Sequence, residues 1–227
     1  MVEGTPVAVI RVVLVDDHRV VTTSLKAYLE SFTDLTVVGV AASGEELLQQ
    51  IERWSPDIVL QDLLLPGGID GIETTRRVLA KGLRVRVIAL TASIDEARMM
   101  GVLRAGAAGY VRKDADPETL LAAVRAVAAG RTYIDPTVSR HLVTGRLTAG
   151  NGLASTADDL TPRERDVLRH LVQGRSNREI AAALDIGDET VKTHVARVLS
   201  KLQVENRAQA IVQALKQGLA TMEELTD

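Results

Sequence analysis

The chain has 227 residues, enough for one large domain or two small ones. With 46% hydrophobic and 25% charged residues it has the composition of an ordinary globular protein, and the lack of cysteine excludes disulfides and thiolate metal sites. The formal net charge of −3 gives no general sign of nucleic-acid binding.

The first apolar run, residues 7–15, is too short to cross a bilayer and contains Arg11. No small-residue cleavage site follows it. We therefore expect a cytoplasmic protein with no membrane partner.

The first 130 residues alternate between short β-branched runs and longer amphipathic stretches. The β-branched runs lie at residues 11–15, 36–40, 58–60, 85–90 and 109–111. The amphipathic stretches lie at about residues 19–32, 44–53, 70–81, 94–105 and 116–129. This alternation predicts an α/β domain, a doubly wound five-stranded parallel sheet with helices on both faces.

From residue 133 the pattern changes. Residues 145–159 are rich in Gly, Ser, Thr and Ala and show no periodicity, which is typical of a linker. Before them, residues 136–142 have room for a short helix.

After residue 160 the pattern is helical only. Four helices are predicted, at residues 160–174, 176–187, 188–204 and 206–218. Thr161 and Glu164 form a capping box at the first, Ser176 or Asn177 caps the second, and Asp188 caps the third. The second and third are separated by about four residues including Gly187, the spacing of a helix-turn-helix.

The charge of this helical segment differs from that of the whole chain. Residues 160–222 contain ten Lys or Arg and seven Asp or Glu, so the segment is basic. A local basic excess favours nucleic-acid binding by the helical part.

Chemically active side chains follow the predicted strands. The first strand runs into Asp16 and Asp17, the third into Asp62, the fourth into Thr91, and the fifth leads to Lys113. Carboxyl ends of parallel strands share one edge, so the three carboxylates would repel each other there unless a cation such as Mg²⁺ binds. Such a group, with a hydroxyl and an ammonium, predicts a phosphoryl site in which an Asp is the nucleophile.

Simpler roles exist for each of these side chains. Asp16 and Asp17 stand before a predicted helix and could cap it, and Thr91 could cap the next one. Tyr110, one of only five aromatic residues, could be an ordinary core residue. It is the combination, in order and at strand ends, that favours the phosphoryl site.

The chain resembles the NarL/FixJ class of response regulators over about residues 9–131 and 158–220. The resemblance rests on Asp16-Asp17, Asp62 followed by Pro66 and Asp70-Gly71, Thr91-Ala92, Tyr110 with Lys113, and the helical motif "ETVKTHV". It implies a flavodoxin-like receiver domain at 1–131, a linker at 132–157 and a LuxR-type helix-turn-helix domain at 158–227.

The resemblance also implies roles for the receiver residues. Asp62 is the phosphoacceptor, and Asp16, Asp17, Asp62 and the backbone carbonyl of Leu64 bind Mg²⁺. Thr91 and Tyr110 form the switch, while Lys113 contacts the phosphoryl group. Leu64 is apolar where many relatives are polar.

For the helical domain the resemblance makes the third helix the recognition helix. The implied DNA contacts are Thr190, Lys192, Thr193, His194, Arg197 and Lys201. On the fourth helix, the implied dimerisation residues are Ala208, Ile211, Val212 and Leu215. The expected partners are a sensor histidine kinase, a second copy of the chain after activation, and an inverted-repeat DNA site.

The function expected is a phosphorylation-activated transcriptional regulator. It would not be an enzyme beyond catalysing its own phosphoryl uptake and loss. One alternative is an Asp-nucleophile phosphohydrolase, but these need a second Asp where Leu64 stands. Another is an atypical regulator whose receiver is never phosphorylated and serves as a dimerisation module. The intact Asp17, Asp62, Thr91 and Lys113 argue against it.

Overall fold

The computed structural model of the chain describes residues 9–149, here the sheet domain, and 160–220, the helical domain. The strands are β1 (Ile10–Val15), β2 (Leu35–Ala41), β3 (Ile58–Asp62), β4 (Arg86–Thr91), β5 (Gly109–Arg112) and β6 (Tyr133–Ile134). The helices of the sheet domain are α1 (Arg19–Glu30), α2 (Gly44–Trp54), α3 (Gly71–Ala80), α4 (Glu96–Arg104), α5 (Pro117–Ala128) and α6 (Pro136–Ala149). Those of the helical domain are α7 (Pro162–Val172), α8 (Asn177–Leu184), α9 (Asp188–Lys201) and α10 (Arg207–Gln217).

The sheet is parallel throughout, with the strand order β2-β1-β3-β4-β5-β6. The predicted doubly wound parallel sheet is confirmed, but the predicted number of five strands is wrong by one. The added strand, β6, is only two residues long, too short to leave a period in the sequence. It pairs with β5 and is followed at once by α6, so the stretch expected to be linker begins with regular structure.

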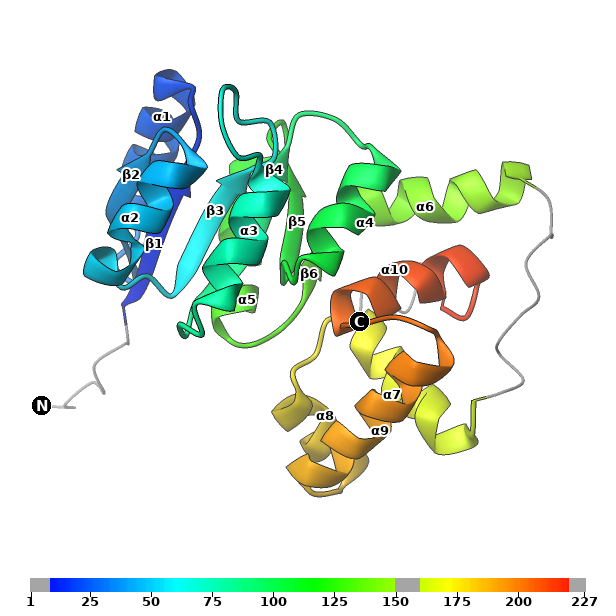
Figure 1. Cartoon of the computed structure of the whole chain (residues 1–227). Coiled ribbons are helices and arrows are strands. Elements are labelled where there is room, and N and C mark those ends of the chain that lie inside the picture. Colours follow the sequence, from blue (N-terminus) through cyan, green and yellow to red (C-terminus); the bar gives the residue numbers. More distant parts are fainter. Residues whose placement is uncertain (1–8, 150–159, 221–227) are drawn as a thin grey trace, which may run out of the picture.

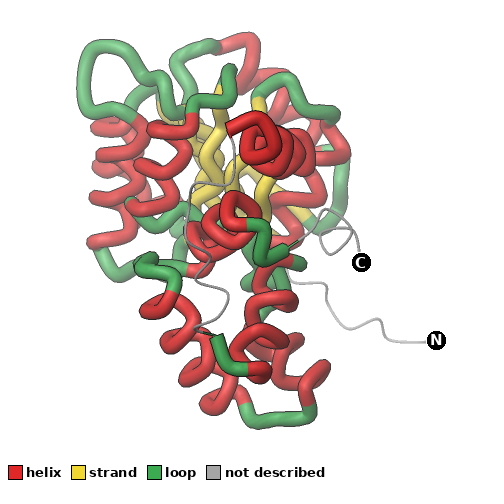
Figure 2. The backbone as a smooth tube through the Cα atoms, turned by 90° about the vertical axis from the view of Figure 1, so that its right-hand side faces the viewer, coloured by secondary structure: helices red, strands yellow, loops and turns green. Residues whose placement is uncertain are grey.

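Helices cover both faces of the sheet (Figures 1 and 2). One face packs on α1 and α5 through a cluster that includes Leu14, Leu60, Ile88, Leu29 and Val124. The other packs on α2 and α3 through a cluster that includes Val13, Val59, Val87, Leu47 and Val78. Strands buried on both faces read as continuous apolar runs, which is why the sequence showed them clearly.

The four predicted helices of the helical domain are present. Both capping boxes form: the hydroxyls of Thr161 and Ser176 accept from the backbone of Glu164 and Glu179. The predicted cap of α9 is corrected by one residue. Gly187 is the N-cap, and Asp188 is the first helical residue.

Helix α10 joins the two domains. It packs on α7 and α9 of its own domain and on α4 and α6 of the sheet domain, and it lies between these two sets of helices in Figure 1. We call the contacts of α10 with α4 and α6 the α10 interface. One apolar cluster runs through it, containing Met99 and Leu103 of α4, Val138 of α6 and Ile211 of α10.

Polar contacts fix the α10 interface at both ends of the helix. The Asn206 amide donates to the carbonyl of Leu103 at 2.6 Å, and Lys216 forms an ion pair with Glu96. The two domains therefore touch through specific groups and not through apolar surface alone.

A second polar contact between the domains lies beside α8. Arg131 binds the carboxylate of Glu179 in a two-pronged ion pair and holds its pKa at about 2, below the usual 4.5. Nearby, the N–H of Thr132 donates to the carbonyl of Gly174 at 2.9 Å. Gly174 has φ of +73°, and a Cβ there would lie 2.3 Å from the Thr132 oxygen, so this approach requires glycine.

Among the described residues, no helix combines the length and apolar character that crossing a membrane requires.

Candidate functional site

The sheet gathers three carboxylates at the ends of β1 and β3. These strands are neighbours in register, so Asp16 and Asp17, just past β1, meet Asp62, the last residue of β3. Asp16 is 4% exposed and Asp62 is 1% exposed. One ligand atom from each of Asp16, Asp17, His18 and Asp62 lies within 4.8 Å of the others, close enough to share one cation. The arrangement expected from strand ends is the one found.

Lys113 provides a positive charge in the same crevice. Its Nζ lies 2.7 Å from Asp16 Oδ2 and 2.8 Å from Asp62 Oδ2, and its backbone N–H donates to the carbonyl of Thr91. Burial alone would lower the pKa of the ammonium, but the two carboxylates outweigh it, and the pKa is raised. Lys113 therefore stays charged and offsets part of the acidic cluster.

Asp62 is held by the loop that follows it. The N–H of Leu64 donates to Asp62 Oδ1 at 3.1 Å, and the Leu64 side chain is 44% exposed beside the crevice. Gly71, which opens α3, lies against Asp62, because a Cβ there would be 2.1 Å from the Asp62 carbonyl oxygen. This close approach explains why Gly71 accompanies the acid, and Asp70 before it caps α3.

Of the two expected switch residues, Thr91 lies on β4, next to the strand of Asp62, and Tyr110 lies on β5, one strand further away. The Thr91 hydroxyl donates to the carbonyl of Ser93 at 2.7 Å, so it is engaged with the loop leading to α4. Tyr110 is fully buried, and burial raises the pKa of its phenol. It belongs to the same apolar cluster as α4, α6 and α10. Because Tyr110 is already inside, any change at this residue on activation would be in what it packs against.

His18 is a neighbour of the site that sequence reasoning missed. Its Nδ1 lies 3.1 Å from Asp16 Oδ1 and 2.9 Å from Asp17 Oδ1. Its place directly after the acid pair was the available signal. It sits at the N-cap of α1, with its backbone N–H donating to Asp16.

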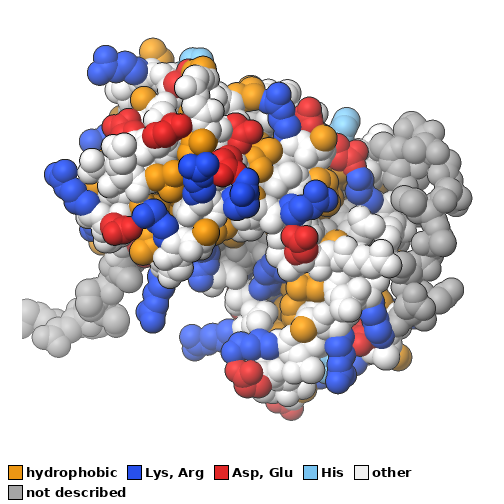
Figure 3. Space-filling view, viewed as in Figure 1, with side chains coloured by type: hydrophobic (Ala, Val, Ile, Leu, Met, Phe, Trp, Pro, Cys, Tyr) orange, Lys and Arg blue, Asp and Glu red, His pale blue; other side chains and the backbone are white. Residues whose placement is uncertain are grey.

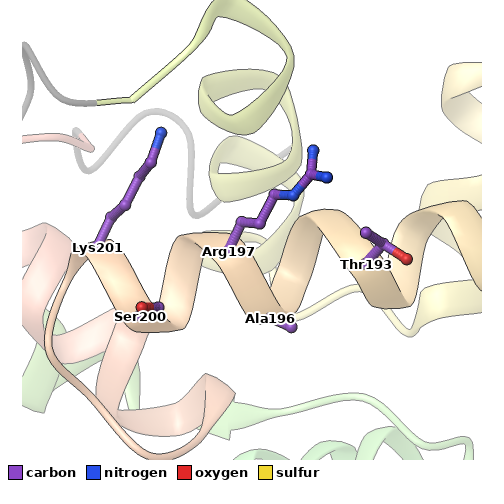
Figure 4. A pocket seen from close by; sticks show the side chains of 5 residues that line it. All are labelled: Thr193, Ala196, Arg197, Ser200 and Lys201. Carbon is purple, nitrogen blue, oxygen red and sulfur yellow. The ribbon is translucent and has the colours of Figure 1, made fainter.

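Helix α9 presents a polar face to solvent, as expected of a recognition helix. Val191 and Val198 are buried against the domain, while Thr190, Thr193 and Arg197 are exposed. A shallow groove along the exposed face is lined by Thr193, Ala196, Arg197, Ser200 and Lys201. Arg197 and Lys201 rise on the same side of the helix (Figure 4).

Two of the expected DNA contacts are held by carboxylates. Lys192 Nζ lies 2.5 Å from Glu189 and 3.4 Å from Asp188, and these acids raise its pKa. Lys201 Nζ lies 2.6 Å from Glu164, a buried side chain of the α7 capping box. Lys201 thus joins α9 to α7, a structural role that sequence alone did not show.

His194 lies apart from the exposed face. It is half-buried, and its Nδ1 has no hydrogen-bond partner within the described parts of the chain.

Basic side chains on the visible face of the helical domain are spread out rather than gathered into one patch (Figure 3).

The four residues expected to mediate dimerisation are all buried. Ala208 and Ile211 are 2% exposed, and Val212 and Leu215 are fully covered. All four belong to the apolar cluster that continues into α4 and α6. In this arrangement they are not available to a second subunit.

Comparison with known proteins agrees with this division of the chain. Residues 12–125 match the family model of the response regulator receiver domain, and residues 158–214 match that of the luxR family of bacterial regulatory proteins.

Curated relatives match along almost their whole length. The uncharacterized transcriptional regulatory protein YhcZ of Bacillus subtilis is 38% identical over 209 residues, 92% of this chain and 97% of its own. The nitrate/nitrite response regulator NarL of Escherichia coli is 37% identical over 205 residues, 88% and 93% of the two chains.

Solved structures show the same likeness. The response regulator ChrA of a heme-sensing two-component system matches with a TM-score of 0.52 and 38% identity, over 94% of this chain and 100% of its own. RcsB of Salmonella typhimurium matches with a TM-score of 0.56 and 26% identity, over 89% and 96%.

Proposed function

Because the chain belongs to the NarL/FixJ family of two-component response regulators, we propose that a sensor histidine kinase phosphorylates it on Asp62 and that this frees α10 for dimerisation on DNA. Its general function, transcriptional regulation through a receiver and a LuxR-type DNA-binding domain, follows from the family. What we propose is which residue accepts the phosphoryl group and how its phosphorylation releases α10.

Mg²⁺ is the cofactor proposed for the acidic crevice. Asp16 Oδ2, Asp17 Oδ1 and Asp62 Oδ2 are buried oxygens whose neighbours, among the described residues, are the side chains of Lys113 and His18. Carboxylates of this kind, with a backbone carbonyl such as that of Leu64, suit the oxygen preference of Mg²⁺. When bound, the ion would offset charge on the phosphoryl oxygens, as Lys113 does.

In this proposal the chain acts on its own Asp62 and not on a separate substrate. The rival phosphohydrolase reading needs a carboxylate two residues after the nucleophile, and Leu64 is there instead. Leu64 follows Asp62 by two residues and is 44% exposed, and an apolar side chain there would shield a phosphoryl group from water and favour its persistence.

The observation that carries the regulatory part is the contrast between α9 and α10. The DNA-reading face of α9 is exposed, whereas the dimerisation residues of α10 are buried in the apolar cluster that α10 shares with α7 and α9 and with α4 and α6 of the sheet domain. Closure of this kind would leave a single domain able to touch DNA while preventing the two-fold pairing that an inverted repeat requires.

A short path links Asp62 to the α10 interface. Drawing Thr91 toward a phosphoryl group would break its hydrogen bond to Ser93, in the loop that leads into α4. Glu96, the first residue of α4, is the partner of Lys216 on α10. A displacement of this loop therefore acts directly on one end of the interface, which is the kind of two-state element that a local charge can bias.

A reversible crosslink tests the proposal. The chain has no cysteine, so replacing Glu96 and Lys216 by Cys and joining them with a short reducible crosslinker locks the interface specifically. With acetyl phosphate and Mg²⁺, we expect locked protein to gain phosphoryl mass but remain monomeric by light scattering. After reduction it should dimerise.

The matched control is the single variant Glu96→Cys treated with the same reagents, which should dimerise throughout. Dimerisation of the locked double variant to the same extent as its reduced form would contradict release of α10. Lack of any phosphoryl uptake by the wild type would contradict the assignment of Asp62.

A further inference from the structure

The first turn of α9 carries two exposed carboxylates where a DNA-reading helix would be expected to carry donors. Asp188 and Glu189 are the first two residues of the helix, with side chains 48% and 86% exposed. Negative charge in the first turn does stabilise a helix through its dipole. That accounts for the charge, but not for the position of Glu189 beside Lys192.

Glu189 and Lys192 form a pair on the exposed side of the helix. Glu189 Oε1 lies 2.5 Å from Lys192 Nζ, and the Thr193 hydroxyl donates to the backbone carbonyl of Glu189. The carboxylate is thus held next to Lys192, one of the residues expected to contact DNA. The next turn exposes Ala196, which has no polar group, and Arg197, a cation suited to a phosphate, whereas the carboxylates of α9 all lie in its first turn.

The chemistry of DNA limits what an exposed carboxylate can bind there. This step rests on the proposed function, in which α9 enters the major groove with its N-terminal residues toward the base edges. Phosphates repel a carboxylate. Its favourable partners are exocyclic amines, and in the major groove Glu accepts from N4 of cytosine, while Lys binds O6 and N7 of guanine.

We propose that Glu189 is a specificity-determining residue that reads a cytosine through its N4 amine, with Lys192 placed beside it to read a guanine. The pair selects DNA in two ways. Binding is tighter when a cytosine occupies one position of each half-site. Binding is weaker when the carboxylate faces a hydrogen-bond acceptor of the base. The half-site therefore contains a fixed C at the position facing the first turn of α9.

Selection from random duplexes tests this with the full-length chain after treatment with acetyl phosphate. We expect Glu189→Ala to lose about 5- to 150-fold of the discrimination at that cytosine, the range for one base contact. Glu189→Gln should instead shift the preference there from C to A, since a Gln amide pairs with N6 and N7 of adenine. Positions other than this cytosine and the guanine read by Lys192 should keep their preferences.

Asp188→Asn is the matched control, because it removes the same charge one residue away. It should strengthen binding to all sequences about equally and leave the selected site unchanged. If Glu189→Gln behaves as Asp188→Asn does, with the same site selected, the cytosine assignment is overturned and Glu189 only serves the helix. A wild type that selects no sequence at all would instead refute DNA reading by α9, so the two failures are distinguishable.

Discussion

Replacing Glu164 by Gln should destabilise the helical domain by breaking the link between α7 and α9. Glu164 is 3% exposed, and its Oε2 lies 2.6 Å from Lys201 Nζ and 2.8 Å from the N–H of Thr161. Gln preserves the size and can still cap the helix. It removes only the charge that Lys201 pairs with.

The magnitude follows from the pKa of Glu164. Lys201, and then the Thr161 backbone, lower it from 4.5 to about 2. A shift of this size corresponds to roughly 3 kcal/mol at neutral pH. Lys201 is 33% exposed, so water screens part of the attraction, and we expect a loss of about 1–3 kcal/mol.

The sign of the pH dependence is fixed by the lowered pKa. A carboxylate whose folded pKa is depressed stabilises the fold above its unfolded pKa, and that stability is lost as pH falls toward the folded value. The wild type should therefore lose this contribution between pH 4.5 and about 2. Glu164→Gln should show no such loss, so the two proteins converge in acid.

Hydrogen exchange of α7 and α9 peptides in the full-length chain measures the effect locally, which is useful because the only tryptophan, Trp54, lies in the sheet domain. Asp166→Asn, on an exposed face of the same helix α7, is the control and should change little. Equal protection of the two variants at pH 7 would refute the reasoning. So would a Glu164→Gln deficit that is the same at pH 7 and pH 3.

Three further outcomes are expected. With acetyl phosphate and Mg²⁺, Asp62→Asn should show no gain of phosphoryl mass and Asp17→Asn a weak one; uptake by Asp62→Asn at the wild-type rate would exclude it as the acceptor. Leu64→Asn and Leu64→Lys should change the half-life of the phosphorylated protein, followed by intact mass, without preventing phosphorylation, and an unchanged half-life in both would remove the shielding role. In fluorescence anisotropy, Lys192→Ala should abolish the preference for the cognate duplex. Arg197→Ala should weaken binding to cognate and scrambled DNA alike and lower the salt dependence of the affinity by about one unit of slope. Full cognate preference in Lys192→Ala would contradict base reading by that lysine.

The acidic crevice could be predicted from sequence because its members stand at strand ends. Parallel strands deliver whatever follows them to one edge, so the order Asp17, Asp62, Thr91, Lys113 along the chain sets their proximity in space. The hydrogen-bond and ion-pair partners of each group, in contrast, are known only from the structure. Which partner Lys113 binds, and that Thr91 is engaged with Ser93, depend on loop geometry that no pattern encodes.

Contacts between the domains were beyond sequence reasoning for a different reason. Asn206, Glu96 and Lys216 look like ordinary surface residues, and they become partners only through the packing of α10 on α4. Lys201 was expected to contact DNA because the resemblance makes α9 the recognition helix. Its partner Glu164 is far away in sequence and already had an assigned role as a helix cap.

The exposure of α9 in the closed arrangement has a consequence for how the proposed switch would act. If closure covered α9, release would change the affinity of each domain for its half-site. Here closure covers α10 instead, so each domain should touch a half-site with the same intrinsic affinity before and after phosphorylation. What release adds is a linked second domain, which makes the second half-site contact intramolecular and can raise total affinity by about 10²- to 10⁴-fold. Phosphorylation should therefore strengthen binding to a full inverted repeat strongly and to an isolated half-site hardly at all. Equal strengthening on both would mean that α9 itself is being changed.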